Sequence, residues 1–225
     1  MPEPLKNRLR TVWQRTPLTT AILVLIALDC LASAFGHYVF PAARSDSLRD
    51  WWSFFTYPLY GNPISLVFSG LWLYLAIADL ERRWGSLRYG LFLAAAVPLS
   101  ALPLLLGAAA FGSAVTVAGP LLPLACLTVV WCLGRLDGVV LYGFLIPIPV
   151  KILLVLEFIL VYLLTVLSTG QPFLSTLALA GPGLSYLYGA YLYPQDKYRA
   201  AAKRSLRKRA PQRRSRHRSR LRIVK

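Results

Sequence analysis

The sequence predicts an all-α polytopic membrane protein in which six helices cross the bilayer and both ends of the chain lie in the cytoplasm. Six long apolar stretches fill residues 18–193, and hydrophobic residues make up 56 % of the 225. A mean hydropathy of +0.54 and a charged fraction of 15 % are more apolar than a soluble domain of this size tolerates. Crossing a hydrocarbon core of ~30 Å takes about 20 helical residues, and the six stretches are long enough to do so.

Each apolar stretch is expected to form one helix. The first, 18–39, is too long for the apolar part of a signal peptide and ends without a small-residue cleavage pattern, so it is expected to span. A polar, partly aromatic loop at 41–62 and a loop of small residues at 108–115 separate later helices, and Pro147 and Pro149 precede the fifth. The expected helices are 18–39, 63–80, 89–107, 116–133, 150–168 and a sixth that ends near Tyr193.

Basic residues fall almost entirely on one side of these helices. With a cytoplasmic N-terminus, the inner segments hold 23 of the 25 Lys and Arg residues, and the outer loops hold only Arg44 and Arg49. The positive-inside rule therefore predicts an N-in, C-in topology. The chain divides into a basic cytoplasmic arm at 1–16, a membrane domain at 17–194 and a basic cytoplasmic tail at 195–225.

The tail carries 14 basic residues between Lys197 and Lys225 and is expected to be disordered in solution. Its expected partner, besides the lipid bilayer itself, is the anionic lipid of the inner leaflet, at about 1 kcal/mol per basic residue near the surface. Contact with RNA or the ribosome is the alternative, because phosphate contacts need only charge. No aromatic residue follows Tyr198 to stack on bases, so a specific nucleic-acid module is not expected.

The three cysteines, Cys30, Cys126 and Cys132, all lie in apolar stretches. The last two are six residues apart, which puts them on different faces of a helix, and no His or carboxylate completes a metal set. We expect them to be small core side chains, with neither a metal site nor a cofactor in the protein.

Four segments of the chain resemble the rhomboid family of intramembrane serine proteases. The stretch from Trp52 to Leu59 (WSFFTYPL) is close to the family's W-R-x-x-T-Y-P-F, with Ser53 where Arg is usual. Residues 65–73 are similar to H-L-x-F-N-x-L-x-L, and residues 80–89 to the more specific turn L-E-x-x-x-G-S-x-R-[FY]. The link at 146–151 also resembles many bacterial members. The resemblance covers roughly residues 48–190 and implies a six-helix rhomboid-like bundle.

The resemblance also identifies residues with structural roles. Glu81 is expected to pair with an arginine and to fix the turn after the second helix. Ser185 and Gly189 form a small-residue face that lets helices approach closely, as helix 6 approaches helix 4 in the family. The residues of these motifs are Trp52, Thr56, Tyr57, Pro58, Glu81, Arg82, Gly85, Arg88, Gly119, Ser185 and Gly189.

The family's nucleophile and base positions are not matched in this sequence. Family proteases carry a serine nucleophile in G-x-S-G near the start of helix 4 and a histidine on helix 6. The nucleophile position falls on Ala118 when Gly119 is taken as the last glycine of the motif, or on Leu121 when residues are counted back from Pro147. The base position falls on Pro182 or Gly181.

The helix 2 positions are also changed, since Ser65 and Ser69 replace the His and Asn that help to hold the oxyanion in the family. An unassisted hydroxyl is a weak nucleophile near neutral pH. The chain has two histidines, of which His217 lies in the cytoplasmic tail and His37 ends the first helix. The resemblance therefore predicts a pseudoprotease that binds transmembrane segments or lipids without cleaving them. The compact six-helix form with short loops favours a bacterial inner (plasma) membrane.

Two alternatives remain at this stage. One is an active intramembrane serine protease with an unaligned nucleophile, for which Ser100 and Ser113 are the candidates. The other is a small proton-coupled transporter that uses Asp29 and Glu157, acids expected about 16 Å and 10 Å from the inner ends of their helices. An ionised carboxylate there costs several kcal/mol, so each is expected to be protonated, partnered or reached by water. No internal repeat or pair of broken helices supports transport.

Overall fold

The computed structural model describes residues 16–35, 40–46, 52–142 and 146–191. The basic tail, nearly all of the basic arm and both histidines, His37 and His217, lie outside these ranges. The described chain is mostly helical, as predicted, and a helix lies in each of the predicted apolar stretches. The helices are α2 (Pro17–Ala34), α4 (Pro63–Trp72), α5 (Ala78–Trp84), α6 (Ser86–Ala110), α7 (Leu121–Leu133), α8 (Val150–Thr169), α9 (Pro172–Ala178) and a last helix over residues 180–191.

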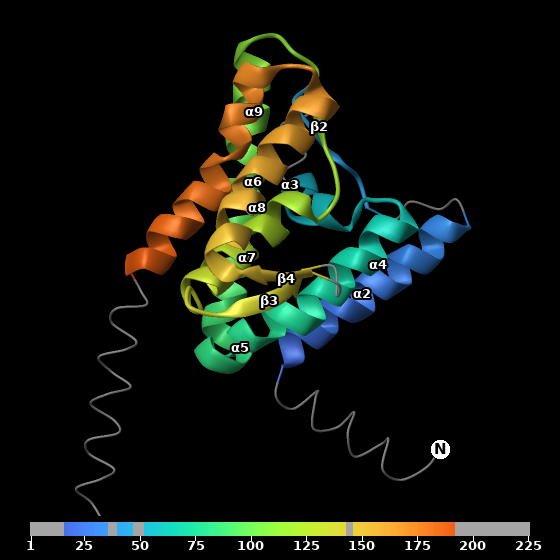
Figure 1. Ribbon diagram of the computed structural model, residues 1–225. Helices are drawn as coiled ribbons and strands as arrows, with labels where there is room; N and C mark the ends of the chain where they lie inside the picture. The colour runs from blue at the N-terminus through green and yellow to red at the C-terminus, as the bar shows by residue number, and fades with distance from the viewer. Residues whose placement is uncertain (1–15, 36–39, 47–51, 143–145, 192–225) are drawn as a thin grey trace, which may run out of the picture.

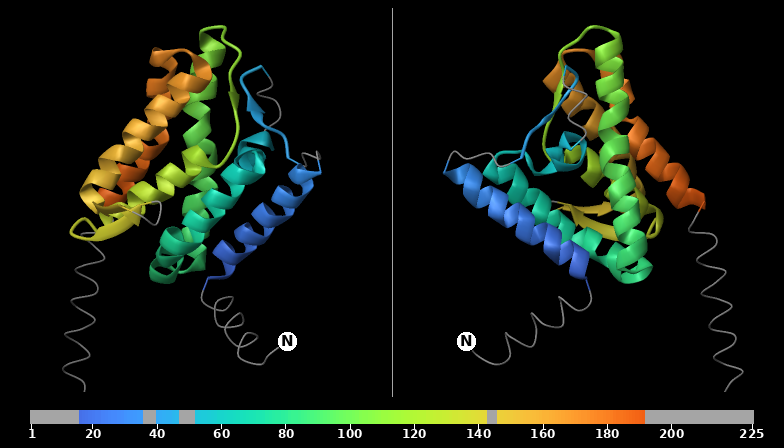
Figure 2. Two further views of the ribbon diagram at one scale, coloured as in Figure 1. Left: turned by 45° about the vertical axis from the view of Figure 1, so that its right-hand side comes forward. Right: turned by 180° about the vertical axis from the view of Figure 1, so that it is seen from behind.

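Helix α7 forms the centre of the molecule (Figures 1 and 2). Its small and aliphatic side chains are buried along almost its whole length, from Leu122 to Cys132. It packs against α6 on one side and α8 on another, while α2 and α4 lie side by side at the edge of the bundle. Of the described helices, α6 and α8 are long and apolar enough to cross a membrane, and α2, α4 and α7 are shorter apolar helices.

The second apolar stretch is longer and less regular than predicted. Helix α4 continues through one π-helical turn, η2 (Leu73–Ile77), into α5, so the helical segment reaches Trp84 rather than ending at residue 80. It stops at Gly85, whose φ of +80° is strained for any residue with a Cβ. Helix α6 begins at the next residue, so this turn is shorter than the sequence suggested.

The predicted fourth helix begins five residues later than expected, because Gly119 adopts φ +82° and Pro120 follows it. Residues before this break form the short strand β2 (Thr116–Val117), antiparallel to β1 (Ala43–Arg44). The proline-bearing link before the fifth helix is a second hairpin, β3 (Val139–Tyr142) with β4 (Ile146–Pro149). The all-α prediction is therefore wrong in these two small sheets.

The helices run alternately between two ends of the bundle. The first turn of α2, the α5–α6 turn, the β3–β4 hairpin and the end of the last helix lie at one end (Figures 1 and 2). The α6–β2 connection and the α8–α9 turn lie at the other end. The short helices α3 (Ser53–Thr56) and η1 (Tyr57–Leu59) pack between α6 and the start of α7.

Candidate functional site

The turn that carries the most specific motif is held together by Glu81. The carboxylate accepts hydrogen bonds from the backbone amides of Leu18 (3.0 Å) and Thr19 (2.9 Å) and from the Ser86 hydroxyl (2.7 Å). The sequence predicted an arginine partner, whereas these partners are neutral donors. The two amides belong to the first turn of α2, where N–H groups lack helical partners and the helix dipole favours a negative charge. Glu81 thus joins α2, α5 and α6.

The same contacts decide the charge of Glu81, which lies just beyond the predicted span 63–80. Burial raises the pKa of this carboxyl, but the hydrogen bonds from Thr19, Ser86 and Leu18 lower it by more. The net pKa lies below the ordinary value, so Glu81 is ionised at neutral pH.

The arginines of this turn have other partners. Arg83 Nε and Arg135 Nη2 both reach Asp79 Oδ2, at 2.7 Å and 2.8 Å. This shared carboxylate ties α5 to the segment that follows α7. The Arg88 guanidinium lies 5.3 Å from the centroid of the Trp84 ring, a cation–π distance.

Tyr57, from the first-loop motif, is fully buried and contacts the third apolar helix. Its hydroxyl lies 2.7 Å from Ser100 Oγ, and both oxygens are within hydrogen-bonding distance of the Val97 carbonyl, at 3.1 Å and 2.8 Å. The Tyr57 carbonyl accepts the Gly119 amide at 3.0 Å. Tyr57 therefore connects the first loop to α6 and to Gly119, two residues before α7. Its motif neighbour Thr56 is buried beside it.

The predicted nucleophile positions hold no reactive atom. Ala118 is exposed between β2 and α7, and Leu121 is the half-buried first residue of α7. Ser100, one of the two candidate nucleophiles, is fully buried against Tyr57. Ser113, the other candidate nucleophile, donates to the side chain of Gln171 near the α8–α9 turn.

The predicted base position is closed by backbone packing. A Cβ added to Gly181 would lie 2.7 Å from Ser100 Cα and 3.2 Å from Cys126 Sγ. One added to Gly189 would lie 2.6 Å from a methyl carbon of Leu133. The last helix thus lies directly against α6 and α7 through these glycines. A side chain at Gly181 would force the helices apart.

Two further residues of the last helix line this contact. Pro182, the alternative base position, is buried and has neither a titratable group nor a backbone N–H. Ser185 is buried beside the Cys126 thiol. All three cysteines are free thiols.

A cavity of about 200 Å³ lies among α2, the α3–η1 segment, α4–η2, α6 and the start of α7. Ser69, one of the two helix 2 positions, supplies the only polar side chain of its lining. Ser65 lies outside the cavity, is exposed, and donates its backbone N–H to Asn62. The lining residues are Ile22, Leu25, Ile26, Phe55, Pro58, Leu59, Ser69, Leu73, Leu93, Val97, Pro120, Pro123, Leu124 and Leu127.

The two intramembrane acids are buried but not brought together. Asp29 is 3 % exposed on α2, and Glu157 is 8 % exposed on α8. Helix α2 packs on α4 and η2, whereas α8 packs on α7 and α9, and both views of Figure 2 show α2 and α8 apart. Within the described ranges, neither carboxyl has a hydrogen bond or an ion pair, and no group of three or more His, Cys, Asp and Glu could hold a metal.

Helices α6 and α8 are long and apolar enough to cross a membrane, and large apolar side chains such as Leu28, Phe68 and Ile159 are exposed on the outer faces of α2, α4 and α8, as helices that face lipid require. The sequence profile of the Rhomboid domain matches residues 48–195, more than half of the chain. The chain therefore belongs to the rhomboid family. No individually curated protein matches it.

The sequence did not reveal three of the contacts that organise this site. The sequence suggests Ser100 only as a displaced nucleophile, whereas its hydroxyl lies against that of Tyr57. Nothing in the local pattern joins these residues, which lie 43 positions apart. The Cys126–Ser185 contact and the bond from Trp72 Nε1 to Thr128 Oγ1 (3.0 Å) are also long-range. Only the serine of the L-E-x-x-x-G-S turn offered a local signal, as a hydrogen-bond donor five residues after Glu81.

Proposed function

We propose that this protein is a rhomboid-like pseudoprotease, which binds transmembrane segments or lipids in the bilayer without cleaving them. The observation that carries the proposal is the closure of the predicted base position, where Gly181 lies so close to Ser100 that no side chain fits. The alternative register places Pro182 there, which has no basic group. In either register the position cannot supply an imidazole.

Serine hydrolysis requires a hydroxyl and a base within hydrogen-bonding reach of each other. Ala118 and Leu121 supply no hydroxyl at the predicted nucleophile position. The buried Ser100 hydroxyl is held by Tyr57 and Val97 and is closed off from solvent. These contacts favour a structural role for the polar groups at the centre of the bundle.

The structure around the unmatched nucleophile and base positions supports a binding role. Tyr57, Gly119 and Glu81 keep the contacts that position the loop, the start of α7 and the inner turn. Next to them lies the cavity that contains Ser69, whose apolar lining suits an apolar guest. We propose that this cavity, which is too small for a helix, receives one or two apolar side chains of a transmembrane client.

The charge pattern supports an orientation with both ends in the cytoplasm, and a bacterial inner membrane is the proposed location. In this orientation the end of the bundle that carries the α5–α6 turn faces the cytoplasm. The basic tail would then meet anionic lipid of the inner leaflet.

Crosslinking in native membranes tests the binding role. Full-length protein with a lipophilic crosslinker is expected to capture proteins with transmembrane segments. Ser69→Trp, which fills the cavity, is expected to reduce the yield several-fold, whereas Val67→Trp, on the exposed side of the same helix and outside the cavity lining, is expected to leave it unchanged. Equal yields from both variants and the native protein would rule out this cavity as the client site.

A further inference from the structure

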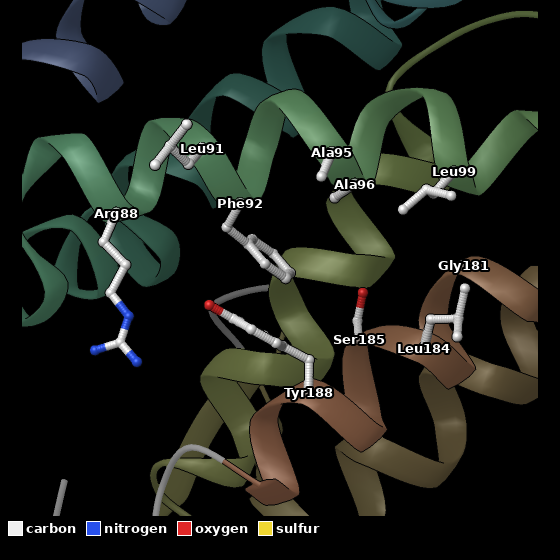
Figure 3. A pocket seen from close by; sticks show the side chains of 10 residues that line it. All are labelled: Arg88, Leu91, Phe92, Ala95, Ala96, Leu99, Gly181, Leu184, Ser185 and Tyr188. Carbon is white, nitrogen blue, oxygen red and sulfur yellow. The ribbon is translucent and has the colours of Figure 1, made fainter.

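A groove of about 360 Å³ runs between α6 and the last helix, on the side away from the client cavity (Figure 3). Residues spaced three and four apart on each helix line it, so each helix contributes one continuous stripe. Leu91, Ala95 and Leu99 come from α6, and Gly181 and Leu184 come from the last helix. Leu91, Leu99 and Leu184 are exposed, while alanine and glycine leave space between them.

The two ends of the groove differ in chemistry. Gly181 and Leu99 form an apolar end, and Arg88 forms the other. At the arginine end, Phe92 and Tyr188 stack at 5.3 Å, and Trp84 lies edge-on to both rings. Figure 3 shows the Arg88 guanidinium and the Tyr188 hydroxyl at this same end. A cation beside a cluster of aromatic rings is typical of the membrane–water interface.

The dimensions of the groove match one lipid chain. From Arg88 to Leu99 it extends about 16 Å along α6, which is close to half of a ~30 Å hydrocarbon core and therefore to one leaflet. Spread over this length, 360 Å³ corresponds to a mean cross-section of about 22 Å². A groove roughly 5 Å wide holds a single hydrocarbon chain, whose carbons contact their neighbours at about 4 Å.

A transmembrane helix fits this space poorly. A helix about 10 Å in diameter fills roughly 420 Å³ in each 5.4 Å turn. The space between the two walls is smaller than one turn, so a partner helix or a second copy of the chain would lie over the groove and leave it unfilled.

We propose that this groove binds an anionic phospholipid, with one acyl chain between α6 and the last helix and the phosphate on Arg88. Arginine recognises phosphate through paired N–H donors, and the positive end of the groove complements the negative headgroup. In the predicted topology Arg88 lies at the inner surface, so the lipid comes from the inner leaflet. The inference extends the lipid-binding part of the proposed function and does not depend on the absence of proteolysis.

Native mass spectrometry of the full-length protein tests the proposal. The protein in detergent is titrated with phosphatidylglycerol or with phosphatidylcholine of the same acyl chains, at ~0.5 M salt. The Debye length is then about 4 Å, which screens the exposed tail charges. We expect one phosphatidylglycerol molecule to remain tightly bound to the protein and phosphatidylcholine to bind more weakly.

Two matched pairs of variants locate the lipid. Arg88→Gln is expected to weaken phosphatidylglycerol binding about fivefold, from ~1 kcal/mol per basic residue, and to leave phosphatidylcholine unchanged. Arg82→Gln removes the same charge from an exposed position outside the groove and should change neither. Ala95→Trp fills the groove and should remove the tightly held lipid, whereas Ala94→Trp, exposed and outside the lining, should retain it.

Equal effects of Arg82→Gln and Arg88→Gln, or lipid retained in Ala95→Trp, would overturn the proposal. A change of oligomeric state in Ala95→Trp, with lipid binding unaffected, would make the groove an interface between copies of the chain and would also overturn it. Leu184→Trp, which fills the groove from its other wall, replaces Ala95→Trp if that variant does not fold. Substrate cleavage by the native protein would contradict the proposed function but leave the lipid site standing.

Discussion

Replacing Glu81 with glutamine is expected to destabilise the protein by about 2–4 kcal/mol. The carboxylate accepts three hydrogen bonds, and an amide in its place can keep at most the two that share one oxygen, from Leu18 and Ser86. The amide nitrogen would then meet the Thr19 N–H, so two donors would face each other at 2.9 Å. Losing a charge-assisted hydrogen bond costs about 1.5–3 kcal/mol, and losing the charge at the α2 N-terminus costs about 0.3–1 kcal/mol more.

Reversible unfolding of the purified protein in mixed detergent micelles measures this cost. Asp137→Asn is the matched control, because Asp137 is 97 % exposed and its contact with Lys151 is long, at 3.5 Å. The control is expected to stay within about 0.5 kcal/mol of the native protein. If Glu81→Gln costs no more than Asp137→Asn, Glu81 does not hold the three helices together.

Acid pH should remove the same stabilisation. Since the folded pKa of Glu81 is depressed, its contribution is fully present above the pKa of the unfolded chain, about 4.3, and is lost as the pH falls through the lower folded value. The stability gap between the native protein and Glu81→Gln should therefore be constant from pH 7 to 5 and narrow below about pH 4. A gap that widens at acid pH would contradict this assignment.

Two further substitutions test the packing of the last helix and of the first loop, each by thermal unfolding in detergent. Gly181→Ala places a Cβ 2.7 Å from Ser100 Cα and is expected to cost about 1–3 kcal/mol, whereas Gly183→Ala, with nothing within 4 Å, should be neutral or stabilising. Equal effects would show that the last helix is not in close contact with α6. Tyr57→Phe should cost about 1 kcal/mol, because Ser100 keeps the Val97 carbonyl as an acceptor. A loss of more than about 3 kcal/mol in the free energy of unfolding would mean that the Tyr57 hydroxyl stabilises more than its contacts with Ser100 and the Val97 carbonyl.

Much of the helical architecture could be predicted, because spanning helices need long apolar runs and proline and glycine punctuate them. The sequence prediction is wrong where the conformation of one or two backbone residues determines where a helix or strand begins or ends. Gly119 and Pro120 delay the start of α7, and the sequence offers no signal that residues 116–117 pair with β1. The π-helical turn between α4 and α5 has no signature in hydrophobic periodicity, since it shifts the register by a single residue.

The site was less predictable than the fold. Family motifs indicated which positions matter, but the partners of those positions are distant in the chain. Glu81 was expected to bind an arginine, yet the amides at the start of α2 provide better-aligned donors that no charge pattern reveals. The closure at Gly181 depends on how near the last helix approaches α6, which the small-residue spacing of Ser185 and Gly189 suggested only in outline.

The most direct test of the account is proteolysis by the purified full-length protein, measured beside an active rhomboid protease on the same transmembrane substrates. Labelling of both proteins with a fluorophosphonate is followed in the same samples. We predict that the active protease cleaves and is labelled, and that this protein does neither. Cleavage by this protein that disappears in Ser100→Ala or Ser113→Ala, with fluorophosphonate attached to that serine, would contradict the account.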